Sequence, residues 1–390
     1  MIVATILSVL GFVLAAAVTQ TKGLRLGGAI LVPTLVVYAL KDFETLPIFL
    51  FSTAVAYLVL WQAKERTLAY GRDEFLIAIG AGALIPVAGF LVIAWVSPGF
   101  VEVHPLVFAG SILPGLAAFN VSQTKPEYRR QDLAYLSALV VGLVLLGWLV
   151  IRPWTARHVA DLTPLVLFAK TSDVAVLNGV VVEGYLAPNI IERRGVIALF
   201  VLGAAMAEFV RRQFGVRIGI ISMALLALFA LVSRWLLVLF VLSFVVSLLA
   251  MHLVHRATLL YGRVLINIGC AVGCLAALLF TTQLPIIRGF SALFVGVIAG
   301  VDAYAVHATP PYERRIQPFL AGAVFLGMAL LLRTAVEPFR RGLFQTFSLV
   351  HVAVGAVVIL GCLLVAYTLS VPEPDDEDVL SASVLSGGEG

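Results

Sequence analysis

Arginine motifs that occur twice are the residues with the clearest chemical potential in this sequence. They are Arg25 and Arg217, then Tyr70-Gly71-Arg72 and Tyr261-Gly262-Arg263, then Arg129-Arg130 and Arg314-Arg315. A guanidinium keeps its charge and offers a fork of donors that binds carboxylates or phosphates. Two interpretations stand. The arginines form a cationic vestibule for an anionic substrate, or they only anchor helix ends at a membrane surface, where glycine permits the turn and tyrosine lies at the headgroup level.

Two polar interruptions of apolar runs are further candidates. Pro114-Gly115 followed by Asn120 predicts a broken segment beside a cavity or translocation path, or else a packing kink. Asp302 replaces an alanine of the first motif copy. A carboxylate within a membrane is costly and therefore a functional candidate, unless it lies near the interface and pairs with His307.

Metal, cofactor and nucleotide chemistry find no support in the sequence. Cys270 and Cys274 lie one helical turn apart, but no further Cys or His completes a metal site, so we expect small residues of a helix interior. His252 and His255 fit a hydrated helix end better than a ligand pair. Nucleotide-binding and zinc-protease motifs are absent. We therefore expect no catalytic residue, no metal and no cofactor.

The composition places these residues in a membrane. Of 390 residues, 61% are hydrophobic and 12% are charged, whereas soluble domains carry about 25% charged residues. Continuous apolar runs such as 2–18 and 75–96 approach the roughly 20 residues that a helix needs to cross ~30 Å of hydrocarbon. The sequence excludes a water-soluble protein and predicts an all-α polytopic membrane protein.

The chain is also similar to itself, at offsets of 185 to 192 residues. Three blocks match in the same order: 23–31 with 215–223, 67–72 with 258–263, and 112–130 with 297–315. Such order predicts a tandem duplication. The predicted parts are a first repeat (1–151), a linker (152–194), a second repeat (195–334), a C-terminal helix (335–370) and an acidic tail (371–390).

Each repeat is predicted to contain about six membrane segments. They are expected near 2–18, 26–40, 46–62, 74–96, 106–121 and 132–151 in the first repeat, and near 196–210, 218–233, 235–253, 264–281, 289–306 and 317–333 in the second. A thirteenth segment is expected at about 345–370. The segments around Pro33 and Pro114 are short and carry helix breakers, so we expect them to be kinked, discontinuous or re-entrant.

Charge in the connecting loops predicts the orientation. In both repeats most of the basic loop residues lie in the odd-numbered loops, whereas loops two and four of the first repeat carry only Lys41. The positive-inside rule places the basic loops in the cytoplasm. The N-terminus and the linker would then lie outside, the C-terminus inside, and the two repeats would be parallel. The alternative is that 162–186 crosses the membrane once, which would invert one repeat. The tail holds six acidic residues and no basic one, so the preceding 370 residues carry a net charge of +10.

One order of motifs resembles a known family. Lys22-Gly23 is followed by GGAILVP at 27–33, LAYGRDEF at 68–75 and AGSILPGLAAFN at 109–120. This succession resembles the PgsC/CapC membrane proteins of poly-γ-glutamate biosynthesis, over about residues 10–150 and more faintly over 205–335. Thr34 stands where the family pattern has glycine, and the second repeat lacks both prolines.

The resemblance implies a subunit of the cell membrane that is itself non-catalytic. Its implied partners are a cytoplasmic ATP-dependent glutamate ligase, an extracellular capsule-type subunit, the lipid bilayer and the anionic polymer, with no nucleic acid. We hypothesise that the repeats face each other around a polymer path with Arg25, Arg72, Arg217 and Arg263 near its cytoplasmic mouth. The alternatives are a secondary transporter for a small anion and a structural scaffold for the ligase.

Overall fold

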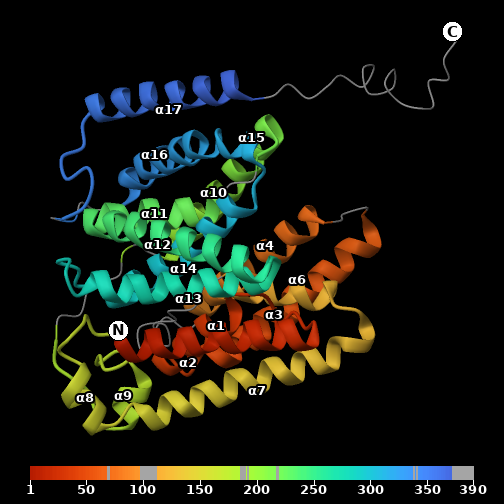
Figure 1. Ribbon diagram of the computed structural model, residues 1–390, viewed down its shortest axis with the longest axis vertical. Helices are drawn as coiled ribbons and strands as arrows, with labels where there is room; N and C mark the ends of the chain where they lie inside the picture. Colours follow the sequence, from red (N-terminus) through yellow and green to blue (C-terminus); the bar gives the residue numbers. More distant parts are fainter. Residues whose placement is uncertain are drawn as a thin grey trace, which may run out of the picture.

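The computed structural model describes residues 1–67, 71–96, 112–184, 190, 193–216, 219–336, 339 and 341–370. Within these residues the chain forms helices and turns, and the only β-type pairing is an isolated bridge between Ser233 and Arg341. The predicted all-α architecture is confirmed. The apolar runs have become long helices that lie side by side (Figure 1).

The helices before residue 152 are α1 (Ile2–Lys22), α2 (Leu31–Lys41), α3 (Thr45–Arg66), α4 (Arg72–Val96), α6 (Leu113–Gln123) and α7 (Pro126–Val150). Two short helices, α8 (Pro153–Val159) and α9 (Asp173–Leu177), follow. The later helices are α10 (Arg193–Phe214), α11 (Ile220–Val232), α12 (Arg234–Thr258), α13 (Gly262–Thr281), α14 (Gly289–Ala308), α15 (Pro311–Arg314), α16 (Gln317–Ala335) and α17 (Leu349–Leu369).

Eight helices in the described residues are long and apolar enough to cross a bilayer. They are α1, α3, α7, α12, α13, α14, α16 and α17. Helices α2 and α11 are apolar but have only 11 and 13 residues, or about 16 and 20 Å at 1.5 Å per residue, less than the hydrocarbon thickness. The chain is therefore a multi-pass membrane protein in which long and short helices are mixed.

The two prolines that predicted kinks lie instead at helix starts. Pro33 is the third residue of α2, and Pro114 is the second residue of α6. A proline in the first helical turn removes no intrahelical hydrogen bond, because the N–H there has no partner within the helix. Of the three expected forms, kinked, discontinuous or re-entrant, the kink is wrong, whereas both helices are short, with 11 residues each. The second-repeat counterpart of α6, α14, is an uninterrupted helix of 20 residues.

The loops gather at two ends of the bundle. One end, which we call the arginine end, contains the chain around residues 23–30, 120–132 and 258–263, since Arg25 bonds Asp132, Asn120 bonds Gly27 and Arg263 interacts electrostatically with Arg25. The other, the linker end, carries α8 and α9 and the start of the chain (Figure 1).

The helices from α1 to α7, which we call the first set, make contacts that recur among the helices from α10 to α16, the second set. Helices α3, α4 and α6 pack on one another, as do α12, α13 and α14. Helix α2 packs on α1 and α7, as α11 packs on α10 and α16. Between the two sets, α1 packs on α13, and α10 contacts α4. In both, the first helix of one set contacts the fourth helix of the other.

The linker folds over one end of the bundle without a helix of membrane-crossing length. Residues 151–184 contain only α8, α9 and turns. The Asn178 amide donates to the carbonyls of Trp148 and Ile151, and the Asp173 carboxylate accepts from the Phe43 N–H. Val166, Leu167 and Phe168 are buried in the main apolar cluster. The alternative of a membrane crossing at 162–186 therefore lacks a suitable helix in the described residues 162–184.

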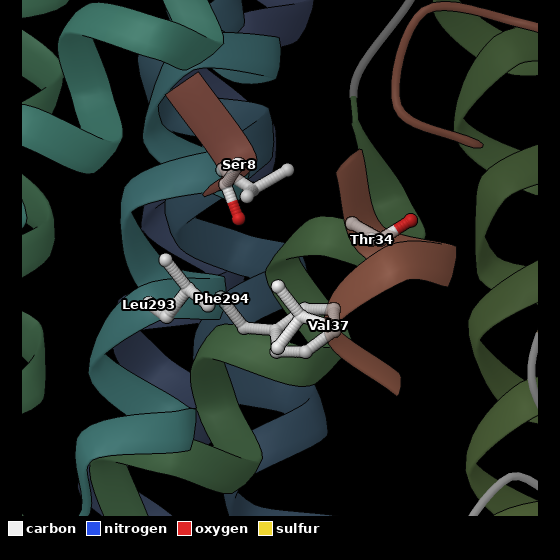
Figure 2. A pocket seen from close by; sticks show the side chains of 6 residues that line it. Ser8, Thr34, Val37, Leu293 and Phe294 are labelled. Atoms are coloured by element: carbon white, nitrogen blue, oxygen red, sulfur yellow. The ribbon is translucent and has the colours of Figure 1, made fainter. Parts of the chain in front are cut away.

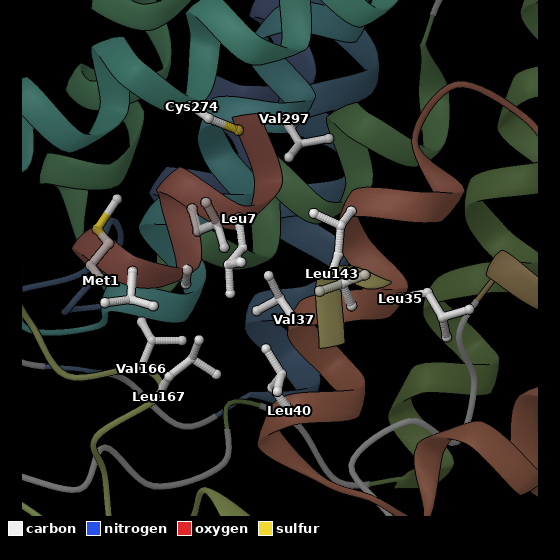
Figure 3. Close-up of a cluster of buried hydrophobic side chains, with 14 of the residues drawn as sticks. Met1, Leu7, Leu35, Val37, Leu40, Leu143, Val166, Leu167, Cys274 and Val297 are labelled. Atoms are coloured by element: carbon white, nitrogen blue, oxygen red, sulfur yellow. The ribbon is translucent and has the colours of Figure 1, made fainter. Parts of the chain in front are cut away.

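The contact between α1 and α13 belongs to the apolar core. Figure 3 shows Leu7 of α1 and Cys274 of α13 in one cluster with Val37, Leu143 and Val297. The cluster draws residues from both sets of helices, and a second buried cluster lies within the later set, mainly between α10, α11 and α16.

Candidate functional site

The backbone that leads into α2 is held in an unusual turn by two polar side chains. Gly23, Gly27, Gly28 and Leu26 all have positive φ. The buried Asp132 carboxylate accepts hydrogen bonds from the N–H groups of Arg25 and Leu26 at 2.7 and 2.9 Å. These two bonds satisfy the backbone where it leaves helical geometry.

Asn120 is the second of these side chains. Its amide nitrogen donates to the Gly27 carbonyl at 3.1 Å and to the Leu116 carbonyl at 2.8 Å. It is buried, with 4% of its surface exposed. The structure thus gives Asn120 a structural role, as a link between α6 and the turn before α2, and the described residues show no path beside it.

Arg25 and Arg263 meet at the arginine end, across the contact between α1 and α13. The Arg263 guanidinium interacts electrostatically with Arg25 and with Asp132. Both arginines are half-buried. Two like charges are thus held near the Asp132 carboxylate. Asp132 was not among the candidates predicted from the sequence, although an acid at the seventh residue of a membrane helix is unusual. Arg217 lies outside the described residues, as does the side chain of Arg72.

The Tyr-Gly-Arg motifs form equivalent turns. Gly71 and Gly262 have φ values of +59° and +63°, a region that glycine enters without steric cost. Tyr261 is 81% exposed, and the Gly262 N–H donates to the Tyr304 hydroxyl. This geometry agrees with an anchor at a helix start. Tyr70 lies outside the described residues.

One arginine of each pair is hydrogen-bonded to backbone carbonyls. The Arg129 guanidinium donates to the carbonyls of Ser122 and Thr124, and Arg314 donates to those of His307 and Thr309. Such bonds satisfy the last carbonyls of a helix. These bonds give Arg129 and Arg314 a structural role, although Arg314 is also exposed. Arg130 and Arg315 are exposed.

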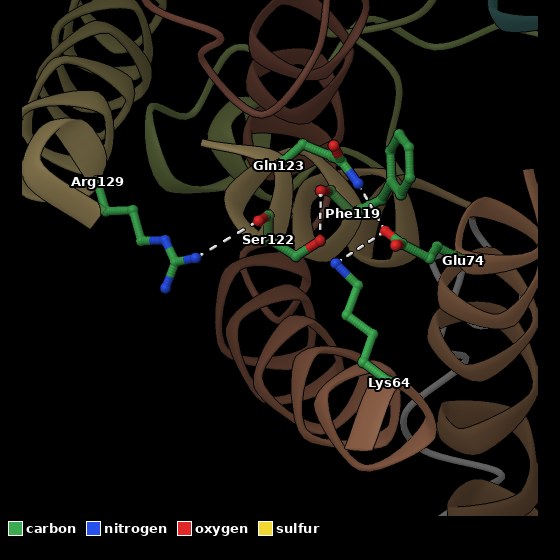
Figure 4. Close-up of polar contacts among 6 residues, drawn as sticks. All are labelled: Lys64, Glu74, Phe119, Ser122, Gln123 and Arg129. Carbon is green, nitrogen blue, oxygen red and sulfur yellow. Dashed lines mark hydrogen bonds and ion pairs between the residues drawn. The ribbon is translucent and has the colours of Figure 1, made fainter. Parts of the chain in front are cut away.

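Next to Arg129 lies an ion pair that sequence reasoning missed (Figure 4). Lys64 and Glu74 are 2.9 Å apart, and the Gln123 amide donates to the same Glu74 oxygen at 2.6 Å. Glu74 is 6% exposed. The pair connects α3, α4 and α6, and its signal in the sequence was an acid in the first turn of an otherwise apolar helix.

Gly115 permits the closest approach between α4 and α6. A Cβ at this position would collide with the backbone of Ala78 and Ile79. Its counterpart Gly300 would place a Cβ 2.5 Å from the Cα of Cys270. The Pro114-Gly115 motif is thus a helix start followed by a packing contact.

Asp302 contacts the start of α11. The Ser222 hydroxyl donates to its Oδ1 at 2.6 Å, and the Gly219 backbone lies so close to the same oxygen that no side chain fits there. His307 instead packs its ring against His255, with centroids 5.0 Å apart, and against His252. The expected alternative of an Asp302–His307 pair is therefore wrong.

Among the described residues, no group of three or more His, Cys, Asp or Glu side chains is arranged to hold a metal ion. Cys270 and Cys274 are fully buried in α13, and the Cys270 thiol lies 3.6 Å from the Val297 carbonyl. They occupy the helix interior, as the sequence predicted.

The interface between the two sets of helices holds a small pocket. It is lined by Ser8, Thr34 and Val37 on one side and by Leu293, Phe294 and Val297 of α14 on the other (Figure 2). Apart from the two hydroxyls its walls are apolar. The described contact between α1 and α13 is filled by the shared core, so the hypothesised polymer path does not run along it.

The turn before α2, the Gly71 turn and the α4–α6 contact all fall within one stretch of chain. Residues 10–130 match the capsule biosynthesis CapC family. The resemblance predicted from the sequence is thereby confirmed for this CapC region. The helices of membrane-spanning length indicate a multi-pass membrane protein. The CapC region ends at Arg130, and residues 205–335 lie outside it. Comparisons with curated proteins and with solved structures gave no significant match.

Proposed function

We propose that the chain is a membrane subunit of a complex that makes and exports poly-γ-glutamate, with the arginine end in the cytoplasm. The observation that supports this most is the match of residues 10–130 to CapC. The gathering of basic loops at one end of the bundle adds an orientation, because basic loops favour the cytoplasmic side. The N-terminus and the linker would then lie outside.

The arginine end is proposed as the surface that docks a cytoplasmic ATP-dependent ligase and guides the polyanion. Its exposed basic residues include Lys22, Arg66, Lys125, Arg130, Arg256, Arg314 and Arg315, and its exposed acids include Glu65, Asp73 and Glu127. The linker end mixes exposed acids such as Asp161 and Glu183 with the exposed bases Arg152, Arg157, Lys170 and Arg234. A one-sided cationic surface attracts a polyanion over long range, and the acidic tail at 371–390 would compete with the polymer for it. An extracellular capsule-type subunit would meet the linker end.

The proposal includes a tandem duplication of the CapC unit. Its support is the self-similarity of the sequence and the recurrence of the same helix contacts in the two sets. The reciprocal contacts, α1 with α13 and α10 with α4, are those that a two-fold axis along the membrane normal would generate. On this arrangement six segments per repeat and α17 give thirteen.

Charge reversal at the two exposed arginines tests the docking role. The double variant Arg130→Glu/Arg315→Glu is expected to lose co-purification of the ligase and polymer output, with unchanged amount and melting temperature of the membrane protein. Arg157→Glu, an exposed arginine of α8 at the linker end, is the matched control and should retain both. Retention of ligase and polymer in the double variant would contradict the proposal.

A secondary transporter for a small anion is the second candidate, because a carboxyl buried among membrane helices, as in Asp302, is typical of proton-coupled transport. Proteoliposomes with the purified chain distinguish the two. Anion uptake without the ligase would support the transporter, whereas polymer synthesis that depends on a co-purifying ligase supports the complex.

A further inference from the structure

An acidic side chain inside the second set of helices has one oxygen without a hydrogen-bond partner. Asp302 of α14 is 6% exposed. Its Oδ1 lies 2.6 Å from the Ser222 hydroxyl, and its Oδ2 is buried with no partner among the described residues. Burial of an ionised carboxylate without a compensating charge is strongly unfavourable.

No cation compensates this carboxylate in the described part of the chain. Asp302 forms no ion pair there, and α11, which supplies Ser222, has no titratable side chain between Ile220 and Val232. The elements packed around Asp302 carry these titratable groups: Arg263, Cys270 and Cys274 on α13, His252, His255, Arg234 and Arg256 on α12, and Tyr304 and His307 on α14 itself. Of these, Cys270 interacts electrostatically with Asp302, and the histidines contact each other instead.

The Ser222 hydroxyl has more acceptors than it has hydrogens. Its oxygen is within hydrogen-bond distance of both the Gly219 carbonyl and the Asp302 carboxyl. A hydroxyl carries one hydrogen and can donate it to only one of them at full strength. With an ionised Asp302, three oxygens would share a single hydrogen in a buried site.

One added proton resolves this arrangement. A protonated Asp302 donates from Oδ1 to the Ser222 oxygen, which donates its own hydrogen to the Gly219 carbonyl. Each donor then has one acceptor, and the carboxyl is neutral. The remaining Oδ2 is then a neutral carbonyl oxygen, which is less costly to bury than a charged one. From this geometry we infer that Asp302 is a proton-binding site within the membrane bundle, bonded through Ser222 to the start of α11.

The first set of helices makes the same connection without a titratable group. The positions equivalent to Asp302 and Ser222 are Ala117 and Ile30, and the link from α6 to the equivalent turn is made by the neutral amide of Asn120. Two neutral hydrogen-bonded links thus occupy corresponding places. Only the one in the second set can gain or lose charge, because its link is an acid.

Loss of the proton would place a negative charge beside the turn that leads into α11. It would also remove the hydrogen bond that the protonated Asp302 carboxyl donates to Ser222. The site itself is independent of the proposed function. Its use rests on that function: proton binding from the arginine end would couple polymer export to the proton gradient across the membrane.

Infrared spectroscopy of the purified full chain in lipid nanodiscs tests the site directly. Near neutral pH the wild type is expected to show the carbonyl stretch of a protonated carboxylic acid, and Asp302→Asn is expected to lose it. Asp132→Asn is the control for another buried carboxyl and should keep the band. The melting temperature of Asp302→Asn should stay close to that of wild type, because the amide can donate to Ser222 as the acid does, whereas Asp302→Ala should melt lower. Identical spectra of wild type and Asp302→Asn would overturn the site.

A second measurement separates the site from its use. In cells, dissipation of the proton gradient at constant ATP should reduce polymer export by the wild type several-fold, and Asp302→Asn should export poorly with or without the gradient. Wild-type export that is insensitive to the gradient, with the infrared band present, overturns the coupling and leaves the ligase co-purification test of the proposed function unaffected.

Discussion

Arg129 and Arg314, which lie 185 positions apart, donate hydrogen bonds to the backbone carbonyls of two equivalent residue pairs. Arg129 donates to Ser122 at 3.4 Å and to Thr124 at 3.0 Å, and Arg314 donates to His307 at 3.1 Å and to Thr309 at 2.8 Å. In both cases a guanidinium from the following helical segment closes the end of the preceding helix. The bond pattern is retained although the residue that supplies one carbonyl has changed from serine to histidine.

Removal of either guanidinium should destabilise the protein. Hydrogen bonds from charged groups contribute about 1.5–3 kcal/mol, so Arg129→Ala should lower the free energy of unfolding by roughly this amount, and Arg314→Ala by less, because Arg314 is exposed. Thermal unfolding in detergent measures the effect. Arg130→Ala and Arg315→Ala, at exposed neighbours, are the controls and should change it by less than about 0.5 kcal/mol. Equal shifts in all four variants would mean that the carbonyl bonds are not the cause.

A methyl group at Gly115 or Gly300 should force a helix pair apart. Each would place a Cβ against the backbone of the neighbouring helix, and overpacking of this kind costs roughly 1–3 kcal/mol. Gly142→Ala and Gly322→Ala are matched controls, because a Cβ at either helical position meets nothing within 4 Å. They should be neutral or slightly stabilising, since alanine favours helix. Thermal melts that rank the controls below Gly115→Ala would refute the close-packing explanation.

The hydrogen bond between Asp302 and Ser222 of the second set of helices should be able to replace the Asn120 link of the first set. Asn120→Ala removes the bond to Gly27 and should destabilise the protein by about 1 kcal/mol. Adding Ile30→Ser and Ala117→Asp to this variant reproduces the arrangement of Ser222 and Asp302 and should recover part of the loss. Ala117→Asp alone, without the serine, should destabilise further because its carboxyl has no donor. Recovery by the triple variant distinguishes an equivalent link from unrelated polar contacts.

Thiol labelling tests the orientation. Arg315→Cys at the arginine end and Arg157→Cys at the linker end introduce exposed thiols in place of exposed arginines. A membrane-impermeant maleimide added to intact cells should label position 157 and reach position 315 only after permeabilisation. Cys270 and Cys274 are buried, and Cys362 is replaced by alanine in all variants to remove background. Labelling of position 315 in intact cells would reverse the proposed orientation.

Much of the fold followed from hydrophobicity alone. A run of about 20 apolar residues has few stable states in a bilayer other than a helix, because only a helix satisfies its own backbone groups. The sequence therefore predicted the long helices such as α7 and α12. The order of its glycine-rich motifs predicted the CapC resemblance over about residues 10–150, and the family match covers 10–130. The two Tyr-Gly-Arg motifs likewise indicated turns, since a glycine at positive φ is a local requirement, and Gly262 has that conformation.

The roles of the polar residues depended on the tertiary structure. Sequence could single out Asn120, Asp302 and the arginine pairs as unusual in an apolar chain, but not say which of them were already bonded. Whether Arg129 is free or bonded depends on carbonyls that the fold brings within reach, and whether Asp302 pairs with His307 or Ser222 depends on which helix packs against α14. The sequence by itself determined where helices form, because that is a matter of local hydrophobicity and backbone geometry. Only the tertiary structure decided which side chains are bonded, because hydrogen-bond partners can lie more than a hundred residues away along the chain, as Asp132 does from Arg25 and Asp173 from Phe43.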